Sequence, residues 1–127
     1  MERYLIDTNV VSDYFSSSLP EDGLQFMDQV INAVPNLSVI TQFELFSWKT
    51  SANIEEKVTG FITDSVILDL KSGIVNSCVR LRRNHMAKTP DAIIAATALV
   101  NKFTLITNNE KDFPMIANLK IINPHSL

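Results

Sequence analysis

The sequence of 127 residues predicts a single α/β domain in which helices cover both faces of a central parallel sheet. Short apolar segments that end at polar residues alternate with longer segments whose apolar residues recur at helical spacing. The short segments are apolar throughout, as expected for strands that are buried on both faces. Hydrophobic residues make up 46% of the chain, which is sufficient for one core.

Five short segments are predicted to be strands. Each is mostly apolar and is bounded by polar or turn-forming residues. The segments are residues 4–6, 37–40, 66–68, 103–106 and 120–122. Because helical segments separate most of them, the strands are expected to run parallel.

Six segments are predicted to be helices, because their apolar residues recur three or four positions apart or follow a helix-starting residue. These segments are residues 10–15, 21–34, 41–48, 54–62, 74–86 and 89–102. The sequence contains no internal repeat, linker or glycine-rich phosphate loop. We therefore expect residues 1–127 to form one domain.

The composition excludes several classes of function. The formal net charge of −3 argues against binding nucleic acid by bulk positive charge alone. It is compatible with an enzyme that carries its own cations, because bound metal ions are then the largest local charges. Cys78 is the only cysteine, which excludes an internal disulfide and a cysteine-rich zinc site. We expect Cys78 to be a small buried hydrophobic residue.

The first residues do not have the pattern of a signal peptide. No apolar run approaches the roughly 18 residues that a membrane-spanning helix needs. We therefore expect a cytoplasmic protein without a membrane partner.

Four acidic residues follow predicted strands or begin the helices after them. Asp7 directly follows the first strand, and Asp112 follows the fourth strand after a short polar stretch. Glu44 and Asp91 lie in the first turns of two predicted helices. Ligands bind beyond the carboxyl ends of the strands in open parallel sheets, so all four acids can converge at one edge.

Each of these acids can also be interpreted as part of a helix cap. Glu44 stands three residues after Thr41, which is the spacing of a capping box. Asp91 lies where a negative charge complements the helix dipole. Asp7 and Asp112 have similar capping positions. The sequence leaves the structural and the functional interpretation open.

The functional interpretation requires a metal ion. A carboxylate directly after a buried strand, such as Asp7, is costly unless it is paired or bound to a cation. Four neighbouring carboxylates repel one another, and a divalent cation relieves that repulsion. Carboxylate oxygens favour Mg²⁺, Ca²⁺ or Mn²⁺ over Zn²⁺. Mg²⁺ is the ion we expect, with Mn²⁺ as a substitute, whereas His85 and His125 lack the spacing of metal ligands. Such an all-oxygen site suits metal-assisted hydrolysis of phosphodiester bonds.

Four sequence blocks resemble those of the PIN-domain family. They are IDTN at residues 6–9, TQFEL at 41–45, TPDAIIAATA at 89–98 and TNNEKDF at 107–113. The third block is quite specific, whereas the first alone would be weak. The similarity spans nearly the whole chain and is closest to the VapC-type toxin ribonucleases of type II toxin–antitoxin modules.

The resemblance implies a three-layer α/β/α sandwich with a central parallel sheet. It also implies Mg²⁺-dependent cleavage of RNA and neutralisation by a cognate antitoxin protein. The family's metal-binding roles carry over to Asp7 and Asp91, and Glu44 and Asp112 would complete the catalytic site. We also expect the protein to form a homodimer.

The first and last blocks carry further implications of the resemblance. Thr8 and Asn9 would brace the turn that holds Asp7. Many relatives have an arginine where this chain has Asn108. Any contact of that arginine with RNA phosphate is therefore missing here or is supplied by another residue.

Four of the eleven basic residues lie shortly before Asp91, namely Arg80, Arg82, Arg83 and Lys88. They could complement the dipole at the end of a helix. They could instead contact the RNA backbone beside the metal site.

Several aromatic residues lie near the predicted site and suggest a partner surface. They are Tyr14, Phe15, Phe43, Phe46 and Trp48. Because a small domain needs aromatic residues in its core, we expect some of them to be buried. The exposed remainder would form an apolar groove for an amphipathic segment of the antitoxin.

Two other classes of function fit part of the pattern. An aspartyl phosphatase or phosphoreceiver domain also has an acid after its first strand. The phosphatase needs a second acid two residues later, where this chain has Asn9, and the receiver needs a lysine directly after a late strand, where this chain has residues 107–109. The other alternative is a PIN-like binding module that has lost catalysis, although all four acids are present.

Overall fold

The computed structural model describes residues 2–85, 88–113 and 116–127, and it contains a five-stranded sheet in the order β3-β2-β1-β4-β5. The strands are β1 (Tyr4–Ile6), β2 (Asn36–Ser38), β3 (Val66–Leu68), β4 (Thr104–Ile106) and β5 (Ile121–Ile122). All neighbouring strands pair in parallel, and β1 lies at the centre between β2 and β4. The predicted parallel sheet is confirmed.

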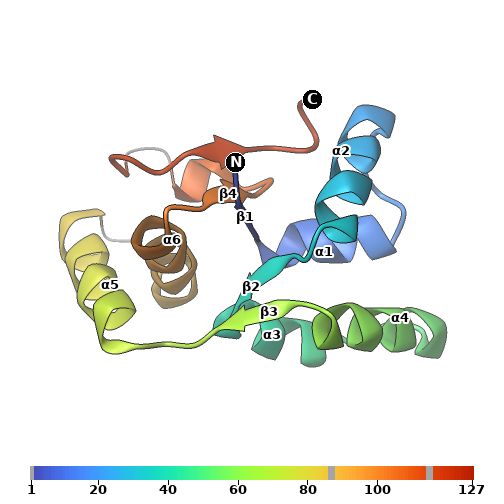
Figure 1. The fold of residues 1–127 in the computed structure, drawn as a ribbon, viewed down its shortest axis with the longest axis horizontal. Coiled ribbons are helices and arrows are strands. Elements are labelled where there is room, and N and C mark those ends of the chain that lie inside the picture. Colours follow the sequence, from blue (N-terminus) through green and yellow to red (C-terminus); the bar gives the residue numbers. More distant parts are fainter. Residues whose placement is uncertain (1, 86–87, 114–115) are drawn as a thin grey trace.

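Helices cover both faces of this sheet (Figure 1). They are α1 (Thr8–Phe15), α2 (Glu21–Asn32), α3 (Val39–Phe46), α4 (Ala52–Thr63), α5 (Ser72–His85) and α6 (Thr89–Asn101). A short 3-10 helix, η1 (Glu110–Asp112), follows β4. The arrangement is the expected three-layer α/β/α sandwich. Met86, the expected last residue of the fifth helix, lies outside the described residues.

The alternation of side chains along the short strands creates two cores. Leu5 and Leu105 face α5 and α6, and both are fully buried. Ile6 and Ile106 point to the opposite face, where they pack with residues of α1, α2 and α4. Because successive strand residues point to opposite faces, three residues suffice to anchor both layers. Strands β1, β3 and β5 therefore read as continuous apolar runs, whereas β2 contains the buried polar residues Asn36 and Ser38 and β4 begins with Thr104.

The start of α3 differs from the prediction. Residues 39 and 40 were expected to continue the second strand because they are β-branched, but they already belong to the helix. The hydroxyl of Ser38 accepts a hydrogen bond from the backbone N–H of Ile40 and thereby caps α3. Thr41, the expected cap, lies within the helix and is fully buried. The cap residue Ser38 thus overrides the strand preference of the two residues after it.

Other element boundaries moved by a few residues. Helix α1 begins at Thr8 rather than at residue 10, because Asp7 caps it. Helix α2 ends at Asn32, two residues before the expected end, and Ala33 has an extended backbone. The following Pro35 disfavours helical backbone at residue 34, which accounts for an early end. The 3-10 helix η1 was not predicted.

The C-terminal tail packs back onto α1 and α2. The backbone of Pro124 lies so close to Gly23 of α2 that a Cβ atom there would stand 1.9 Å from the Pro124 carbonyl oxygen. Only glycine allows this approach. One residue further on, Nε2 of His125 lies 2.9 Å from Oδ2 of Asp13 in α1. The tail is therefore fixed at two points to the first two helices.

The aromatic residues divide between core and surface. The ring of Phe15 packs edge-to-face against Tyr14 and also against Phe61 of α4. Phe43 and Phe46 of α3 are 66% and 58% exposed. Contrary to expectation, none of the five aromatic residues near the site is fully buried, but Tyr14, Phe15 and Trp48 are half-buried and pack against the core. Among the described helices, none has the length and apolar character that crossing a membrane requires.

Candidate active site

The first two predicted acids meet in a cleft beyond the carboxyl ends of the central strands. Asp7 directly follows β1, and Glu44 lies on α3, the helix that follows β2. Asp91 reaches the same cleft from the first turn of α6. All three line this cleft, which has a volume of about 390 Å³. The structure thus brings Asp7 and Asp91 to the same cleft, although they are 84 positions apart in the chain.

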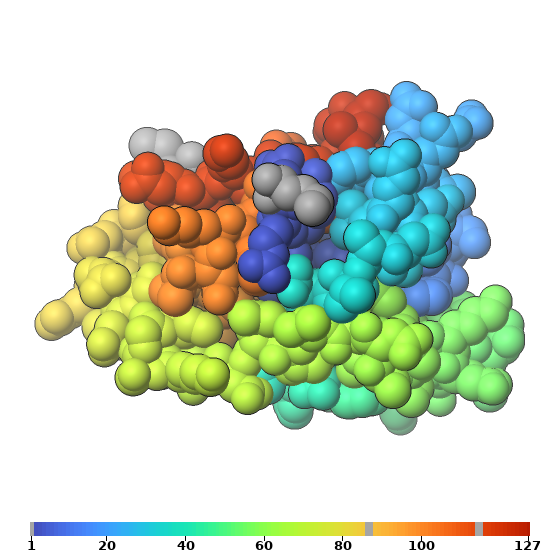
Figure 2. Space-filling view, viewed as in Figure 1, coloured from blue at the N-terminus to red at the C-terminus, as the bar shows by residue number. Residues whose placement is uncertain are grey.

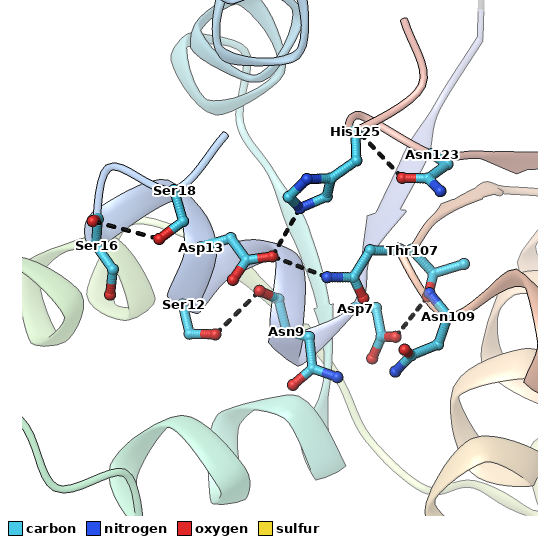
Figure 3. A network of polar contacts seen from close by, with 11 residues as sticks. Asp7, Asn9, Ser12, Asp13, Ser16, Ser18, Thr107, Asn109, Asn123 and His125 are labelled. Carbon is cyan, nitrogen blue, oxygen red and sulfur yellow. Dashed lines mark hydrogen bonds and ion pairs between the residues drawn. The ribbon is translucent and has the colours of Figure 1, made fainter. Parts of the chain in front are cut away.

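Asp7 is held in one orientation by two hydrogen bonds. Its Oδ1 accepts a bond of 2.8 Å from the backbone N–H of Thr8, and its Oδ2 accepts one of 2.8 Å from the hydroxyl of Thr107 (Figure 3). The residue is only 5% exposed. Its own N–H donates to the carbonyl of Ile106 in β4. Both main chain and side chain of Asp7 are therefore fixed by the neighbouring strand.

The electrostatic environment of Asp7 opposes ionisation. Burial raises the pKa of the Asp7 carboxyl group, whereas the hydrogen bonds from Thr107 and Thr8 lower it. The charges of Asp91 and Glu44 raise this pKa further. The net shift is upward, so the ionised carboxylate lacks a compensating cation within the protein itself. Capping of α1 by Asp7 is real, but it does not account for the neighbouring acids.

Glu44 is oriented by α1 rather than by its own helix. The hydroxyl of Thr8 donates a hydrogen bond of 2.6 Å to Oε1 of Glu44 and lies 3.1 Å from the hydroxyl oxygen of Thr41. The capping-box interpretation of Thr41 and Glu44 is wrong, because Ser38 caps α3. Thr8 therefore links Asp7, through its N–H, to Glu44, through its hydroxyl. This agrees with the expected bracing role of Thr8.

Asp91 is half-buried at the start of α6. Burial raises the pKa of its carboxyl group, and the charges of Asp112 and Glu44 raise it as well, whereas Lys88 lowers it. The position in the first turn also suits the helix dipole. The two neighbouring acids show that Asp91 belongs to a group of carboxylates rather than to a helix end alone.

Asp112 lies at the margin of this group. It ends the 3-10 helix η1, is exposed, and does not line the 390 Å³ cleft. Its charge nevertheless raises the pKa of Asp91, so the two carboxyl groups are electrostatically coupled. The structure therefore places three of the predicted acids on the cleft wall and the fourth beside them.

The donor groups at the cleft fit a hard divalent cation. All the ionisable groups there are carboxylates, whose oxygens suit Mg²⁺ or Mn²⁺. Within the described part of the chain, no three acidic, histidine or cysteine side chains form a ready-made metal cage. Mg²⁺ does not require one, because it is usually held by one or two carboxylates and keeps several waters. Neighbouring carboxylates raise the pKa values of both Asp7 and Asp91, and a bound cation relieves this repulsion.

The two histidines lie outside the cleft, and His125 has a different role. Its ring contacts Asp13, whose Oδ2 also accepts a hydrogen bond of 2.8 Å from the side-chain amide of Asn108. Figure 3 shows this network between α1, the residues after β4 and the C-terminal tail. Asn108 thus ties the segment after β4 to α1.

Two residues at the site, Thr107 and Ser12, were not assigned roles by sequence reasoning, and Trp48 was assigned only to the expected partner surface. Thr107 orients Asp7 and accepts a hydrogen bond from the backbone N–H of Asn109. Ser12 and the half-buried Trp48 line the cleft beside the carboxylates. The signal for Thr107 was its place directly after a buried strand. Ser12 carries no comparable signal, because helix faces that point to a site and to the core have the same spacing. Trp48, which follows the end of α3, was noted only as an aromatic residue near the site.

The basic segment before Asp91 divides into two groups. Nη1 of Arg82 donates a hydrogen bond of 2.7 Å to the hydroxyl of Thr89, the first residue of α6. Lys88 precedes α6 and acts electrostatically on Asp91. Arg80 instead lines a separate and larger cleft along α5. Arg82 and Lys88 are therefore placed at the start of α6, the helix that carries Asp91, whereas Arg80 lines the other cleft.

Solved structures of similar shape come from bacterial toxin–antitoxin complexes. A chain of a toxin–antitoxin complex from Klebsiella pneumoniae is 31% identical to this chain, with a TM-score of 0.75. The match covers 95% of this chain and 97% of that chain. A chain of DNA-bound VapBC from Salmonella typhimurium has a TM-score of 0.80 at 21% identity, with 98% of this chain and 99% of that chain covered. For VapBC2 from Rickettsia felis, bound to a promoter DNA fragment, the TM-score is 0.76 at 22% identity, with 94% and 97% covered.

The sequence comparison agrees with these structures. Among curated protein sequences, none matches the chain. The family comparison gives a match to the PIN domain over residues 4–119, which includes every strand from β1 to β4 and all the acids of the cleft. With the three-layer fold and the 31% identical relative, this match shows that the chain belongs to the PIN-domain family.

Proposed function

We propose that the protein is a magnesium-dependent endoribonuclease and the toxin of a toxin–antitoxin pair. The observation that carries the proposal is the convergence of Asp7, Glu44 and Asp91 on one cleft, with Asp112 coupled to Asp91. Membership of the PIN-domain family supports nuclease chemistry at these acids. The 31% identical relative belongs to a toxin–antitoxin complex, which supports the biological role.

Asp7 and Asp91 would hold the metal ion, and Glu44 and Asp112 would complete the site. A divalent ion bound there would activate water for attack and neutralise charge on the scissile phosphate. The protein's own contribution is positional: the bonds from Thr8 and Thr107 fix Asp7, and the Thr8 hydroxyl fixes Glu44. Such fixed groups need no reorganisation when charge develops in the transition state.

The wall of the cleft also suits a nucleic acid. The indole of Trp48 lines the cleft beside the carboxylates, where an unstacked base could pack against it. Asn9 and Ser12 add polar groups at the same wall. We propose RNA rather than DNA as the substrate because the sequence blocks resemble those of toxin ribonucleases.

The direct test is cleavage of single-stranded RNA by the purified protein. We expect RNA fragments in the presence of Mg²⁺ and none with Asp7→Asn. The matched control is Asp69→Asn, which removes the same charge from an exposed residue outside the cleft. Equal cleavage by the wild type and Asp7→Asn would show that the activity arises elsewhere or from a contaminant. Phosphate transfer to Asp7 without RNA cleavage would favour the phosphatase or receiver alternative.

We propose that α3 contributes to the surface that the antitoxin covers. Phe43 and Phe46 are more than half exposed on this helix, which also carries Glu44. An amphipathic segment docked there would bury both rings close to the cleft. Co-expression with the product of the neighbouring gene should give a complex without RNase activity. Failure of that product to bind or inhibit would contradict the toxin–antitoxin role and leave the nuclease proposal standing.

We further propose that the protein acts in the cytoplasm as a homodimer, as expected from its resemblance to the toxin ribonucleases. Light scattering of the purified protein across a concentration series should give twice the mass of the chain. A monomer at all concentrations would contradict the dimer without affecting the chemistry of the cleft.

A further inference from the structure

A second and larger cleft lies at the opposite edge of the sheet. It has a volume of about 1180 Å³ and is lined by α5, the end of α6, residues 116–120 and the residues before β1. Figure 2 shows the segments around residues 2–3, 100–104 and 116–120 next to one another on the displayed face. These segments precede β1, β4 and β5, so this cleft opens at the amino edge of the sheet. The carboxylates of the candidate active site lie at the carboxyl edge.

The wall of this second cleft is strongly basic. Arg3, Arg80, Lys102 and Lys120 line it, which is four of the eleven lysines and arginines of the chain. Glu2 is the one acid among its described lining residues. The surplus of positive charge occurs in a protein whose formal net charge is −3. A concave surface with one sign of charge focuses the field and attracts the opposite charge.

The local structure positions Arg3 and Lys102, and the carboxylate of Glu2 is hydrogen-bonded to neighbouring residues. The guanidinium of Arg3 lies over the ring of Phe103, 5.3 Å from the centroid, which holds the charge at the cleft. Lys102 ends α6 with left-handed backbone. The carboxylate of Glu2 accepts a hydrogen bond of 2.6 Å from the Thr104 hydroxyl and a second, of 3.2 Å, from Tyr4. Glu2 is therefore engaged with its neighbours, and the basic groups face the cleft in excess.

The basic cleft leads toward the carboxylates. It follows α5 as far as His85, the last residue of that helix. The hydrogen bond from Arg82 to Thr89 places the last turn of α5 beside the first turn of α6, which carries Asp91. Strands of three residues separate the two edges of the sheet by only about 10 Å. The end of α5 therefore lines the basic cleft through His85 and lies beside the helix that carries Asp91 into the active-site cleft.

We infer that the basic cleft along α5 binds the phosphate backbone of single-stranded RNA that flanks the cleavage site. The inference rests on the proposed ribonuclease function. A positive groove that follows the backbone is the means by which proteins bind single strands without reading sequence. The cluster of acids at the active site repels phosphate, so affinity for a long substrate has to come from another surface. The basic cleft supplies that surface, about one strand length from the active site.

The test compares two double variants on the background of Asp7→Asn, which prevents cleavage during the measurement. Arg80→Gln with Lys102→Asn removes two charges from the cleft, and asparagine tolerates the left-handed backbone at 102. Lys57→Gln with Lys71→Gln removes two charges from exposed residues outside it. The affinities for single-stranded RNAs of about 16 and about 4 nucleotides are measured across a salt series.

The cleft variant should lose two phosphate contacts with the longer RNA. Its salt slope should fall by about 1.4, at roughly 0.7 per contact, so its deficit relative to the control shrinks about sevenfold from 50 to 200 mM salt. The shorter RNA presents fewer phosphates to the cleft, so the difference in salt slope between the two variants should be smaller for it. Equal slopes for the two variants on the longer RNA would overturn the inference.

Two further outcomes distinguish RNA binding at the cleft from peptide binding there and from failure of the ribonuclease proposal. If the cleft variant binds RNA normally but loses affinity for polyglutamate, the cleft accepts an acidic peptide and the inference is wrong. If the protein with Asp7 restored does not cleave any RNA, the ribonuclease proposal itself has failed. Circular dichroism of both variants controls for folding. Since the substituted basic side chains are all exposed, we expect both variants to give the spectrum of the Asp7→Asn protein.

Discussion

The hydroxyl of Thr107 donates a hydrogen bond of 2.8 Å to Oδ2 of Asp7, and the two residues are 100 positions apart in the chain. Thr107 directly follows β4, and Asp7 directly follows β1, so the parallel pairing of these strands sets the contact. Both residues are buried. A buried hydroxyl that donates to a carboxylate forms a stronger bond than two neutral groups do. The candidate active site is therefore built around the seam between β1 and β4.

We expect Thr107→Val to reduce cleavage strongly and to destabilise the fold by about 1–3 kcal/mol. Valine keeps the shape, but it leaves Asp7 and the N–H of Asn109 without their partner. Thr107→Ser keeps the hydroxyl and should recover most of the activity. The measurements are kcat, KM and urea unfolding of all three proteins. If Thr107→Val and Thr107→Ser lower kcat equally, the hydroxyl of Thr107 does not position Asp7.

Asp7→Asn and Asp91→Asn should each abolish cleavage while the fold survives. The amide keeps the shape of the carboxylate but removes the charge that holds the cation. Because burial and like charges raise the pKa of both groups, their neutralisation should also raise the metal-free melting temperature. Asp69→Asn serves as the control. Normal RNase activity in either site variant would exclude the proposed carboxylate site.

Removal of divalent metal should stop the reaction. We expect EDTA to abolish cleavage, and Mg²⁺ or Mn²⁺ to restore it when added back alone, because the cleft presents carboxylate oxygens. Zn²⁺ should not restore it, since neither histidine nor Cys78 lines the cleft. The readout is the rate of RNA cleavage with each metal. Undiminished cleavage in EDTA would contradict the metal-dependent mechanism.

Charge reversal of Arg82 and Arg83 together should weaken RNA binding more than it slows the chemical step. Backbone contacts position a nucleic acid but do not carry out the reaction. The guanidinium of Arg82 already donates a hydrogen bond to Thr89 at the start of α6, the helix that carries Asp91. Affinity across a salt series and single-turnover rates at saturating enzyme separate the two effects. An unchanged salt slope would mean that these arginines only complement the end of α5.

The stability of the protein should fall as the pH rises from 10 to 12. Burial, the hydrogen bond to Asp28 and the charge of Asp28 together raise the pKa of Tyr14 to about 12. The folded state therefore holds this proton more tightly than the unfolded state, whose ordinary pKa is 10.0. The resulting stabilisation is complete below the unfolded pKa and is lost as the pH rises through the folded value.

Tyr14→Phe isolates this effect from other groups that titrate at high pH. The variant should lose less stability than the wild type over that pH range, because it has no phenol to deprotonate. Urea unfolding at a series of pH values gives the difference directly. Parallel curves for the two proteins would show that Tyr14 does not contribute.

Sequence reasoning succeeded where one residue pattern had one physical cause. Most strands of the sheet are short and largely apolar because both faces are covered, and the order of strands and helices was sufficient for a parallel sandwich. It failed at the start of α3, where the apolar residues 39 and 40 suit a strand and a buried helix equally well. Only the capping bond of Ser38 decides between the two.

The candidate site was predictable as far as strand ends determine it. Asp7, Glu44 and Asp91 follow strands or begin helices at the carboxyl edge, and they line one cleft. Their positioning partners were less accessible, because the bond from Thr107 to Asp7 depends on the pairing of distant strands. The basic cleft was not predictable either. Its four cations are scattered from Arg3 to Lys120 and meet only in the folded chain.

The pairing of the first strand with β4 also sets the order of events during synthesis. A growing chain that has reached residue 103 contains Asp7, Glu44 and Asp91 but lacks β4 and the hydroxyl of residue 107. Central strand β1 then has one free edge, and the Asp7 N–H has no carbonyl from Ile106 to bond. We therefore expect a nascent chain on the ribosome to be inactive until its last fifth has emerged. Under the proposed function, a ribonuclease built this way spares the RNA around it while it is being translated.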